Sequence, residues 1–233
     1  MVIVTGATGA IGQEICRLFA AAGEDVCVCC HSRTEAAEAL CLSLAEEYGV
    51  RAVWQAVDLA DAASIRRAFA YFLSVFGRCD YLVNNAAVSL VKPVSMMTDA
   101  EWDHVIAVDL TACYHTCRCV LDDMYHLGGS IVNVSSMWGQ LGASCEVAYS
   151  AAKAGLEGMT KALADEYAGT VRVNAVALGY VDTPMNAHLS PEEKAQFFVE
   201  HPGMRCLSPR EAAEAVYAAA VAPVSGDVVR IGW

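Results

Sequence analysis

The amino-terminal segment passes from an apolar run to a glycine-rich turn and then to a helical stretch. Residues 1–5 are apolar enough for a buried strand, residues 6–12 are mostly small, and residues 13–22 carry apolar side chains on one face. Small residues let a backbone approach a phosphate closely, and the N–H groups that open a helix attract its charge. The segment therefore predicts a strand–turn–helix phosphate cradle. Its turn contains Gly6, Thr8, Gly9, Ala10, Ile11 and Gly12.

The rest of the chain continues this alternation of strand and helix. Apolar runs predict further strands at 25–30, 52–57, 81–84, 131–134, 172–176 and 228–231. Helical patterns lie between them at about 34–48, 62–76, 99–124, 146–167 and 209–220. Such alternation predicts one α/β domain of Rossmann type over residues 1–233, a doubly wound parallel sheet with right-handed crossovers and helices on both faces.

Three polar residues in the second half of the chain have the types and spacing of a proton-transfer site. Tyr149 and Lys153 lie one helical turn apart, so their side chains share a face. An ammonium near a phenol favours the phenolate and lowers the pKa of the tyrosine, which makes Tyr149 a candidate general acid and base. Ser136 follows the strand predicted at 131–134, at the sheet edge where such folds bind ligands. A Tyr-x-x-x-Lys pair alone is more often a surface pair, so the assignment depends on the phosphate cradle.

The end of the second predicted strand bears on the choice of dinucleotide. An acidic residue there would bind the adenosine ribose and repel a 2′-phosphate. The sequence has instead His31, Ser32 and Arg33, all of which can donate hydrogen bonds to phosphate. NADP(H) is therefore favoured over NAD(H), and a merely solvated Arg33 would leave the preference open.

Charge and cysteine usage limit the classes of partner. The formal net charge is -12 with no cluster of basic residues, which argues against nucleic acid and anionic membranes. Eleven cysteines is an odd count, and Met1 begins the first strand directly, so we expect a reducing, cytoplasmic location. No apolar run is long enough to span a bilayer. The clusters at 27–30 and 113–119 lack zinc-finger spacing, so we predict buried small side chains and no metal site.

These motifs together resemble those of the short-chain dehydrogenase/reductase family over nearly the whole chain. Ser136 precedes Tyr149 by the thirteen residues that the family shows. The segments that match family motifs are 5–12, 57–59, 84–87, 172–179 and 181–184. The overall pattern and length look most similar to bacterial 3-oxoacyl-[acyl-carrier-protein] reductases.

The resemblance implies further cofactor contacts. It places Asp58 and Leu59 beside the adenine and Asn85, Ala86 and Ala87 along the adenosine side. It places Gly179, Val181 and Thr183 in the segment that covers the nicotinamide and its carboxamide. Tyr149 and Lys153 are implied to contact the cofactor too, the lysine through the ribose hydroxyls of the nicotinamide half.

The reaction implied by the resemblance is hydride transfer between the nicotinamide and a carbonyl or secondary alcohol carbon. Ser136 would hold the carbonyl oxygen, Tyr149 would protonate it, and Lys153 would lower the pKa of the tyrosine. Asp109 stands where the family has a fourth catalytic residue, an asparagine. Its charge would stabilise protonated Lys153 and oppose phenolate at Tyr149, so we expect activity with a shifted pH optimum.

The substrate is less constrained by the sequence. A 3-oxoacyl group on an acyl carrier protein agrees with the resemblance, but an acidic carrier needs a basic docking patch, and residues 167–171 contain none. A free small ketone, sugar or steroid alcohol is the alternative. Residues 185–209 are expected to form a substrate lid, in which Phe197, Phe198 and Met204 predict an apolar pocket unless they are core.

Two further expectations concern function class and assembly. Four altered motif positions, Ala10, Ala87, Leu178 and Asp109, also fit a dinucleotide-binding regulator or scaffold without turnover. Retention of Ser136, Tyr149 and Lys153 favours an enzyme. The helical segment 99–124 and the one at 146–167 both carry more apolar residues than one buried face needs, and Trp233 is a candidate interface anchor unless it covers the sheet's edge. With the family resemblance, this predicts a homotetramer or at least a homodimer.

Overall fold

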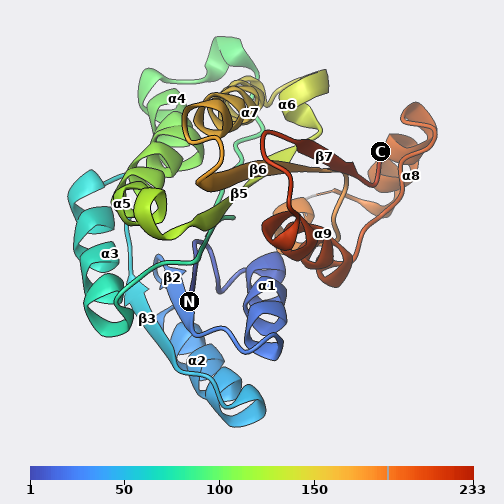
Figure 1. Cartoon of the computed structure of the whole chain (residues 1–233). Coiled ribbons are helices and arrows are strands. Elements are labelled where there is room, and N and C mark those ends of the chain that lie inside the picture. The colour runs from blue at the N-terminus through green and yellow to red at the C-terminus, as the bar shows by residue number, and fades with distance from the viewer. Residues whose placement is uncertain (188) are drawn as a thin grey trace.

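The computed structural model describes residues 1–187 and 189–233 and contains one seven-stranded sheet (Figure 1). Every neighbouring pair of strands is parallel, and their spatial order is β3-β2-β1-β4-β5-β6-β7. The strands are β1 Val2–Val4, β2 Val26–Cys30, β3 Ala52–Ala56, β4 Tyr81–Asn84, β5 Gly129–Ser136, β6 Val171–Leu178 and β7 Val228–Ile231. This order confirms the predicted Rossmann-type doubly wound fold.

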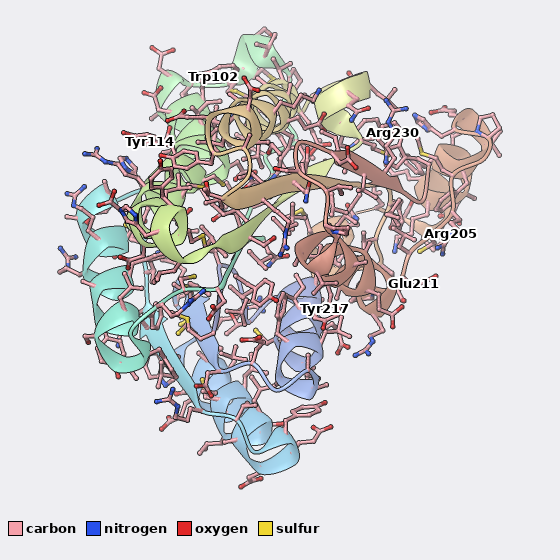
Figure 2. All side chains as sticks on the ribbon, in the orientation of Figure 1. Trp102, Tyr114, Arg205, Glu211, Tyr217 and Arg230 are labelled. Carbon is pink, nitrogen blue, oxygen red and sulfur yellow. The ribbon has the colours of Figure 1, made fainter. Side chains whose placement is uncertain are left out.

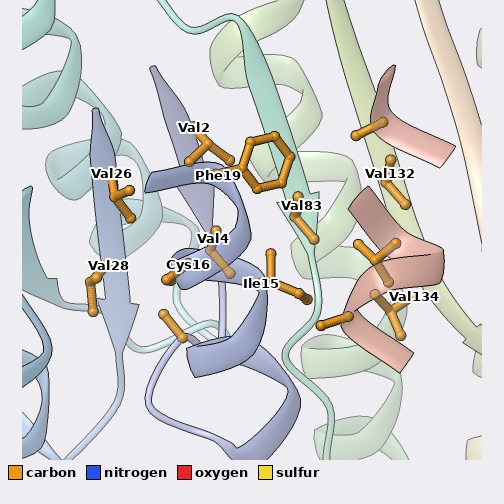
Figure 3. Packing of buried hydrophobic residues seen from close by; sticks show 14 of the residues in the cluster. Val2, Val4, Ile15, Cys16, Phe19, Val26, Val28, Val83, Val132 and Val134 are labelled. Atoms are coloured by element: carbon orange, nitrogen blue, oxygen red, sulfur yellow. The ribbon is translucent and has the colours of Figure 1, made fainter. Parts of the chain in front are cut away.

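Helices cover both faces of the sheet. They are α1 Ala10–Ala21, α2 Thr34–Tyr48, α3 Ala62–Phe76, α4 Asp99–Ile106, α5 Ala112–Leu127, α6 Trp138–Leu141, α7 Val147–Glu166, α8 Pro191–Glu200 and α9 Pro209–Val221. Side chains along β1 point alternately to the two faces, as a strand buried on both sides requires. Val2 and Val4 pack with α1, α2 and α9, as Figure 3 shows for Ile15 and Phe19 of α1. Ile3 packs with α3 and α5 on the other face.

The helix predicted at 99–124 is interrupted. A π-helical turn, Ala107–Thr111, separates α4 from α5, which continues to Leu127. Such turns insert an extra residue into a helix and often lie at functional sites. A capping box begins α4, since Thr98 and Glu101 exchange hydrogen bonds.

Both predicted cysteine clusters are largely buried. Cys27, Cys29 and Cys30 lie inside β2, and Cys113 and Cys117 lie on the inner side of α5, whereas Cys119 is half-buried. All eleven cysteines are free thiols. Within the described part of the chain, no group of three His, Cys, Asp or Glu side chains is placed to hold a metal. None of the helices among residues 1–187 and 189–233 is long and apolar enough to cross a bilayer.

The segment expected to be a lid contains α8, which the sequence analysis did not predict. Ser190 and Glu193 form a capping box at its start. The far end of the segment joins the sheet region, because Leu207 bridges to Val181 and the Arg205 N–H donates to the Gly232 carbonyl oxygen. Figure 1 shows α8 at one edge of the molecule beside the carboxyl terminus. Residue 188 of the expected lid lies outside the described residues.

Candidate active site

The glycine turn forms one wall of a cavity of about 570 Å³ at the carboxyl ends of β1 and β2. Helix α1 begins after Gly9 with no side-chain cap, so its first N–H groups open toward this cavity. Gly6 has φ +62, and a Cβ there would lie 2.8 Å from the Cα of Ala86. All six residues predicted in the turn line the cavity: Gly6, Thr8, Gly9, Ala10, Ile11 and Gly12.

Side chains after β2 and β3 form the far end of this cavity. His31, Ser32 and Arg33 are exposed at its edge. Asp58 and Leu59 lie across from them, where the Asp58 carboxylate accepts a hydrogen bond from the Ala60 N–H at 2.9 Å. This end therefore offers one cationic side chain and one carboxylate in reach of a ligand.

A buried polar network fixes the loop after β4. The side-chain amide of Asn85 donates to the Thr5 carbonyl oxygen at 3.0 Å. The backbone N–H groups of Asn85 and Ala86 donate to the Thr5 hydroxyl at 3.0 and 3.1 Å. These bonds tie the loop to the glycine turn. Asn85, Ala86 and Ala87 consequently line the same cavity.

Ser136, Tyr149 and Lys153 line a second cavity of about 490 Å³ at the carboxyl end of β5. Its lining also includes Gly179, Val181 and Thr183 from the segment after β6. The two cavities adjoin, because they share Ile11, Asn85, Ala87, Thr183 and Met185. Every predicted site residue thus lines one cavity or both, except Asp109.

Lys153 is buried and bonded from two sides. Its Nζ donates to the Val134 carbonyl oxygen at 3.1 Å, lies 3.6 Å from Asp109 Oδ2, and lies 5.4 Å from the centre of the Tyr149 ring. Burial acts to lower the pKa of Lys153, but the Asp109 carboxylate and the Tyr149 phenol outweigh it and hold the pKa above its ordinary value. The ammonium form is therefore favoured.

Asp109 lies in the π-helical turn, behind Lys153 rather than in the cavity. It is fully buried, and its Oδ1 accepts a hydrogen bond from the Val88 N–H at 2.8 Å. Burial raises the pKa of Asp109, and the Lys153 ammonium opposes this rise. The uncharged asparagine that the family has at this position could not form such an ion pair.

Lys153 lowers the pKa of Tyr149 as predicted, but other groups outweigh its effect. Burial raises the pKa of the phenol, and although Lys153 and a hydrogen bond with Ser136 lower it, Asp109 and Glu146 raise it further. The pKa therefore lies above its ordinary value. The sequence prediction counted the ammonium but not the desolvation of the phenol.

Ser136 is the last residue of β5, and its hydroxyl oxygen accepts a hydrogen bond from the Trp138 N–H at 3.2 Å. The same hydroxyl group is hydrogen-bonded to Tyr149, so a ligand oxygen that binds between them would replace that bond. Behind Ser136, the buried Glu157 carboxylate accepts hydrogen bonds from Ser135 Oγ and Gln140 Nε2, each at 2.9 Å. These bonds fasten α6 to α7 and so hold Ser136 opposite Tyr149.

Several cavity residues were not found by sequence analysis. Trp138, Glu146, Tyr180, Glu200 and His201 line the second cavity, and His104 lines the first. Of the apolar residues expected in the lid, Phe197 lines the second cavity, whereas Phe198 and Met204 do not. Two signals were available in the sequence, the position of Trp138 two residues after Ser136 and the place of Glu200 and His201 in the expected lid.

Comparisons with known proteins agree with this geometry. The family model described as short chain dehydrogenase matches residues 1–194. A 3-oxoacyl-[acyl-carrier-protein] reductase of Aquifex aeolicus is 36% identical over 98% of this chain and 94% of its own length. An acetoacetyl-CoA reductase of Allochromatium vinosum is 36% identical over 97% and 90%. A cis-4-hydroxycyclohexanecarboxylate dehydrogenase of Sinomonas cyclohexanicum is 37% identical over 92% and 86%.

Proposed function

This chain belongs to the short-chain dehydrogenase family, and from that premise we propose that it is an NADPH-dependent reductase of 3-oxoacyl thioesters. Its class is that of an oxidoreductase that transfers hydride between a nicotinamide and a carbonyl or alcohol carbon. One observation carries the proposal. The hydroxyls of Ser136 and Tyr149 and the ammonium of Lys153 belong to a single cavity that adjoins the glycine-turn cavity.

The residues divide the proton chemistry among them. Ser136 donates a hydrogen bond to the carbonyl oxygen and holds it near Tyr149. Tyr149 gives its proton to that oxygen, and Lys153 stabilises the phenolate that is left. When bound, the nicotinamide supplies the hydride. Lys153 lowers the pKa of Tyr149 against the effect of burial and so helps the phenol to give up its proton.

The first cavity fits the dinucleotide. Uncapped N–H groups at the start of α1 can bind a pyrophosphate, and the small residues of the turn leave room for it. Arg33, with His31 and Ser32, supplies donors for a 2′-phosphate at the far end. Asp58 lies after β3 rather than at the end of β2, where an acid would select the ribose hydroxyl. We therefore assign NADP(H) rather than NAD(H).

The substrate class follows from the named relatives. Two of the three act, by their names, on a 3-oxoacyl group carried by a protein or on acetoacetyl-CoA, and both substrates are 3-oxoacyl thioesters. A whole acidic carrier is a poorer fit, because the net charge is -12 and residues 167–171 contain no basic side chain. The thioester itself is thus the part that we assign to the cavity.

Turnover of a defined panel tests the proposal. Purified protein is mixed with NADPH and an acetoacetyl thioester, a diketone or a steroid ketone, and loss of the NADPH absorbance is followed. We expect the thioester to be reduced fastest, with NADH replacing NADPH poorly. Preference for another ketone would favour the alternative substrate class. Tight NADPH binding without turnover of any compound would favour the non-catalytic regulator.

Assembly and location are part of the proposal. Trp102 of α4 and Tyr114 of α5 are exposed on one side of the molecule (Figure 2), which supports a homodimer through these helices or a homotetramer. Trp233 packs within its own chain instead, since its Nε1 donates to the Ala177 carbonyl oxygen at 3.0 Å. The eleven free cysteines support a reducing compartment, the cytoplasm. Light scattering should give a multiple of 24.8 kDa at micromolar concentration, and a single species of that mass would contradict the assembly.

A further inference from the structure

Aromatic rings form one wall of the second cavity, in which the substrate would bind. Trp138 meets the Phe197 ring edge-on at 6.1 Å and the His201 ring at 5.7 Å, and Tyr180 lies 5.5 Å from Phe197. The wall joins the carboxyl end of α8 to α6, because Phe197 lies on α8, His201 directly follows that helix and Trp138 begins α6. A substrate held by Ser136 and Tyr149 would therefore contact rings on the side of α8.

His201 is fixed within this wall. Its ring stacks on Phe197 at 4.6 Å, and its Nδ1 lies 2.9 Å from the Phe197 carbonyl oxygen. A carbonyl oxygen can only accept, so Nδ1 carries a hydrogen and donates.

The charged side chains of the cavity are mainly negative. Glu146 lies at the start of α7, bonded to the Ser89 hydroxyl, and Glu200 lies at the end of α8, bonded to Gln196. Among the described residues that line the cavity, Lys153 is the only lysine or arginine. Its charge is already paired with Asp109 at 3.6 Å. Glu146 is half-buried and Glu200 is exposed, so the negative charge that a substrate meets acts most strongly near Glu146.

We propose that this cavity selects uncharged 3-oxoacyl esters and thioesters and rejects the corresponding free 3-oxo acids, with Glu146 and Glu200 as the specificity-determining residues. The inference rests on the proposed function and narrows it. A carboxylate inside the cavity would lose water against an aromatic wall and would face two like charges, with no unpaired lysine or arginine among the described lining residues. The acyl end of a thioester is uncharged, so it meets neither the cost of desolvation nor the repulsion by the two glutamates.

A matched pair of substrates tests the selection. Ethyl acetoacetate and acetoacetate have the same oxo group and differ at the acyl end by an ester in place of a carboxylate. We expect kcat/KM for the ester to exceed that for the acid by at least about 100-fold, the discrimination that an uncompensated charge produces. Equal values would overturn the inference and leave the reductase assignment intact, whereas reduction of neither compound would count against both.

Charge-neutral variants test the two glutamates. Glu146→Gln and Glu200→Gln keep the size of each side chain, and each should reduce the ester-to-acid ratio by about three- to tenfold. Effects on Tyr149 act on both substrates alike and cancel in this ratio. Glu192→Gln is the matched control, because Glu192 is an exposed residue of α8 that does not line the cavity. An unchanged ratio in both test variants, or an equal change in the control, would overturn their role.

Discussion

The two adjoining cavities are built in different ways. The first cavity is bounded largely by backbone and short side chains at the ends of β1, β2 and β4, including the glycine turn. The second is bounded largely by side chains that project from α6, α7, α8 and the segment after β6. In the first, the sheet itself sets the geometry. In the second, helices and loops at the edge of the sheet set it.

This difference explains what each cavity can tolerate. A turn whose backbone packs against its neighbours leaves no room for larger residues, as the close approach of Gly6 to Ala86 shows. Trp138 and Phe197 lie outside the sheet, on α6 and α8, and their rings meet each other, so their replacement should alter the shape of the cavity without disturbing the sheet. Changes in the first cavity, the cofactor half of the site, should therefore lower the stability of the protein. Changes in the second cavity, the substrate half, should lower activity or alter specificity.

The largest expected effect separates the two halves. Tyr149→Phe should lower kcat by at least about 100-fold, as expected of a lost general acid, while the Kd for NADPH stays within about twofold. Stopped-flow reduction and fluorescence titration of NADPH measure the two quantities. The substrate half would thus fail with the cofactor half intact.

Tyr180→Phe is the control for that prediction. Tyr180 lines the same cavity, and its buried hydroxyl has no hydrogen-bond partner among the described residues. We expect its kcat to fall by less than about tenfold, because no hydrogen bond is lost. Similar losses in both variants, or near-normal turnover in Tyr149→Phe, would remove the acid role from Tyr149.

The reverse experiment breaks the cofactor half. A Cβ at Gly12 would lie 2.7 Å from the Ala7 Cα and closer still to the Gly6 carbonyl oxygen. Gly12→Ala should therefore lower the free energy of unfolding by about 1–3 kcal/mol and weaken NADPH binding. Gly158→Ala on α7 meets nothing within 4 Å and should raise stability by about 0.5–1 kcal/mol. Urea unfolding compares the two, and equal stability would contradict the packing argument.

A smaller effect should distinguish the two dinucleotides. Arg33→Ala should raise KM for NADPH by about tenfold and leave KM for NADH within about twofold, because only NADPH carries the 2′-phosphate. Arg66→Ala, which alters a residue of α3 outside both cavities, serves as the control. Equal losses for both cofactors would mean that Arg33 does not contact the phosphate.

The sequence allowed most of the fold and the cofactor half to be predicted. Helices 34–48 and 62–76 and strands 81–84 and 228–231 have the predicted bounds. Periodic apolar residues and capping signals suffice for such elements because each one packs on a continuous sheet. The glycine turn was equally predictable, since its conformation depends on residues adjacent in the sequence.

The substrate half was not predictable in the same way. Trp138, His201 and Glu146 come together only because α6 and α8 fold over the end of β5, and no local pattern specifies that contact. The π-helical turn was missed because the apolar pattern runs through it without a break. Desolvation of Tyr149 was missed for a related reason, since burial depends on elements distant in the sequence.

The Asp109–Lys153 ion pair connects the two cavities, although Asp109 itself lines neither. Asp109 lies between α4 and α5, and its Oδ1 accepts from the Val88 N–H in the loop that borders the first cavity. Its carboxylate faces Lys153, which lines the second cavity. A change at Asp109 should therefore reach the chemistry of Tyr149 through charge alone, without reshaping either cavity.

The last and smallest prediction concerns pH. Asp109 raises the pKa of Tyr149 by its negative charge, so Asp109→Asn should lower that pKa. Alcohol oxidation needs the phenolate as base, and its rising limb should move to lower pH by about one unit or less. The pH dependence of kcat for a secondary alcohol with NADP measures this shift, with Asp103→Asn of exposed α4 as the control. An unmoved profile would mean that the charge of Asp109 does not act on Tyr149. A shift to higher pH would mean instead that Lys153 has lost its proton, because the buried ammonium depends on Asp109 for its charge.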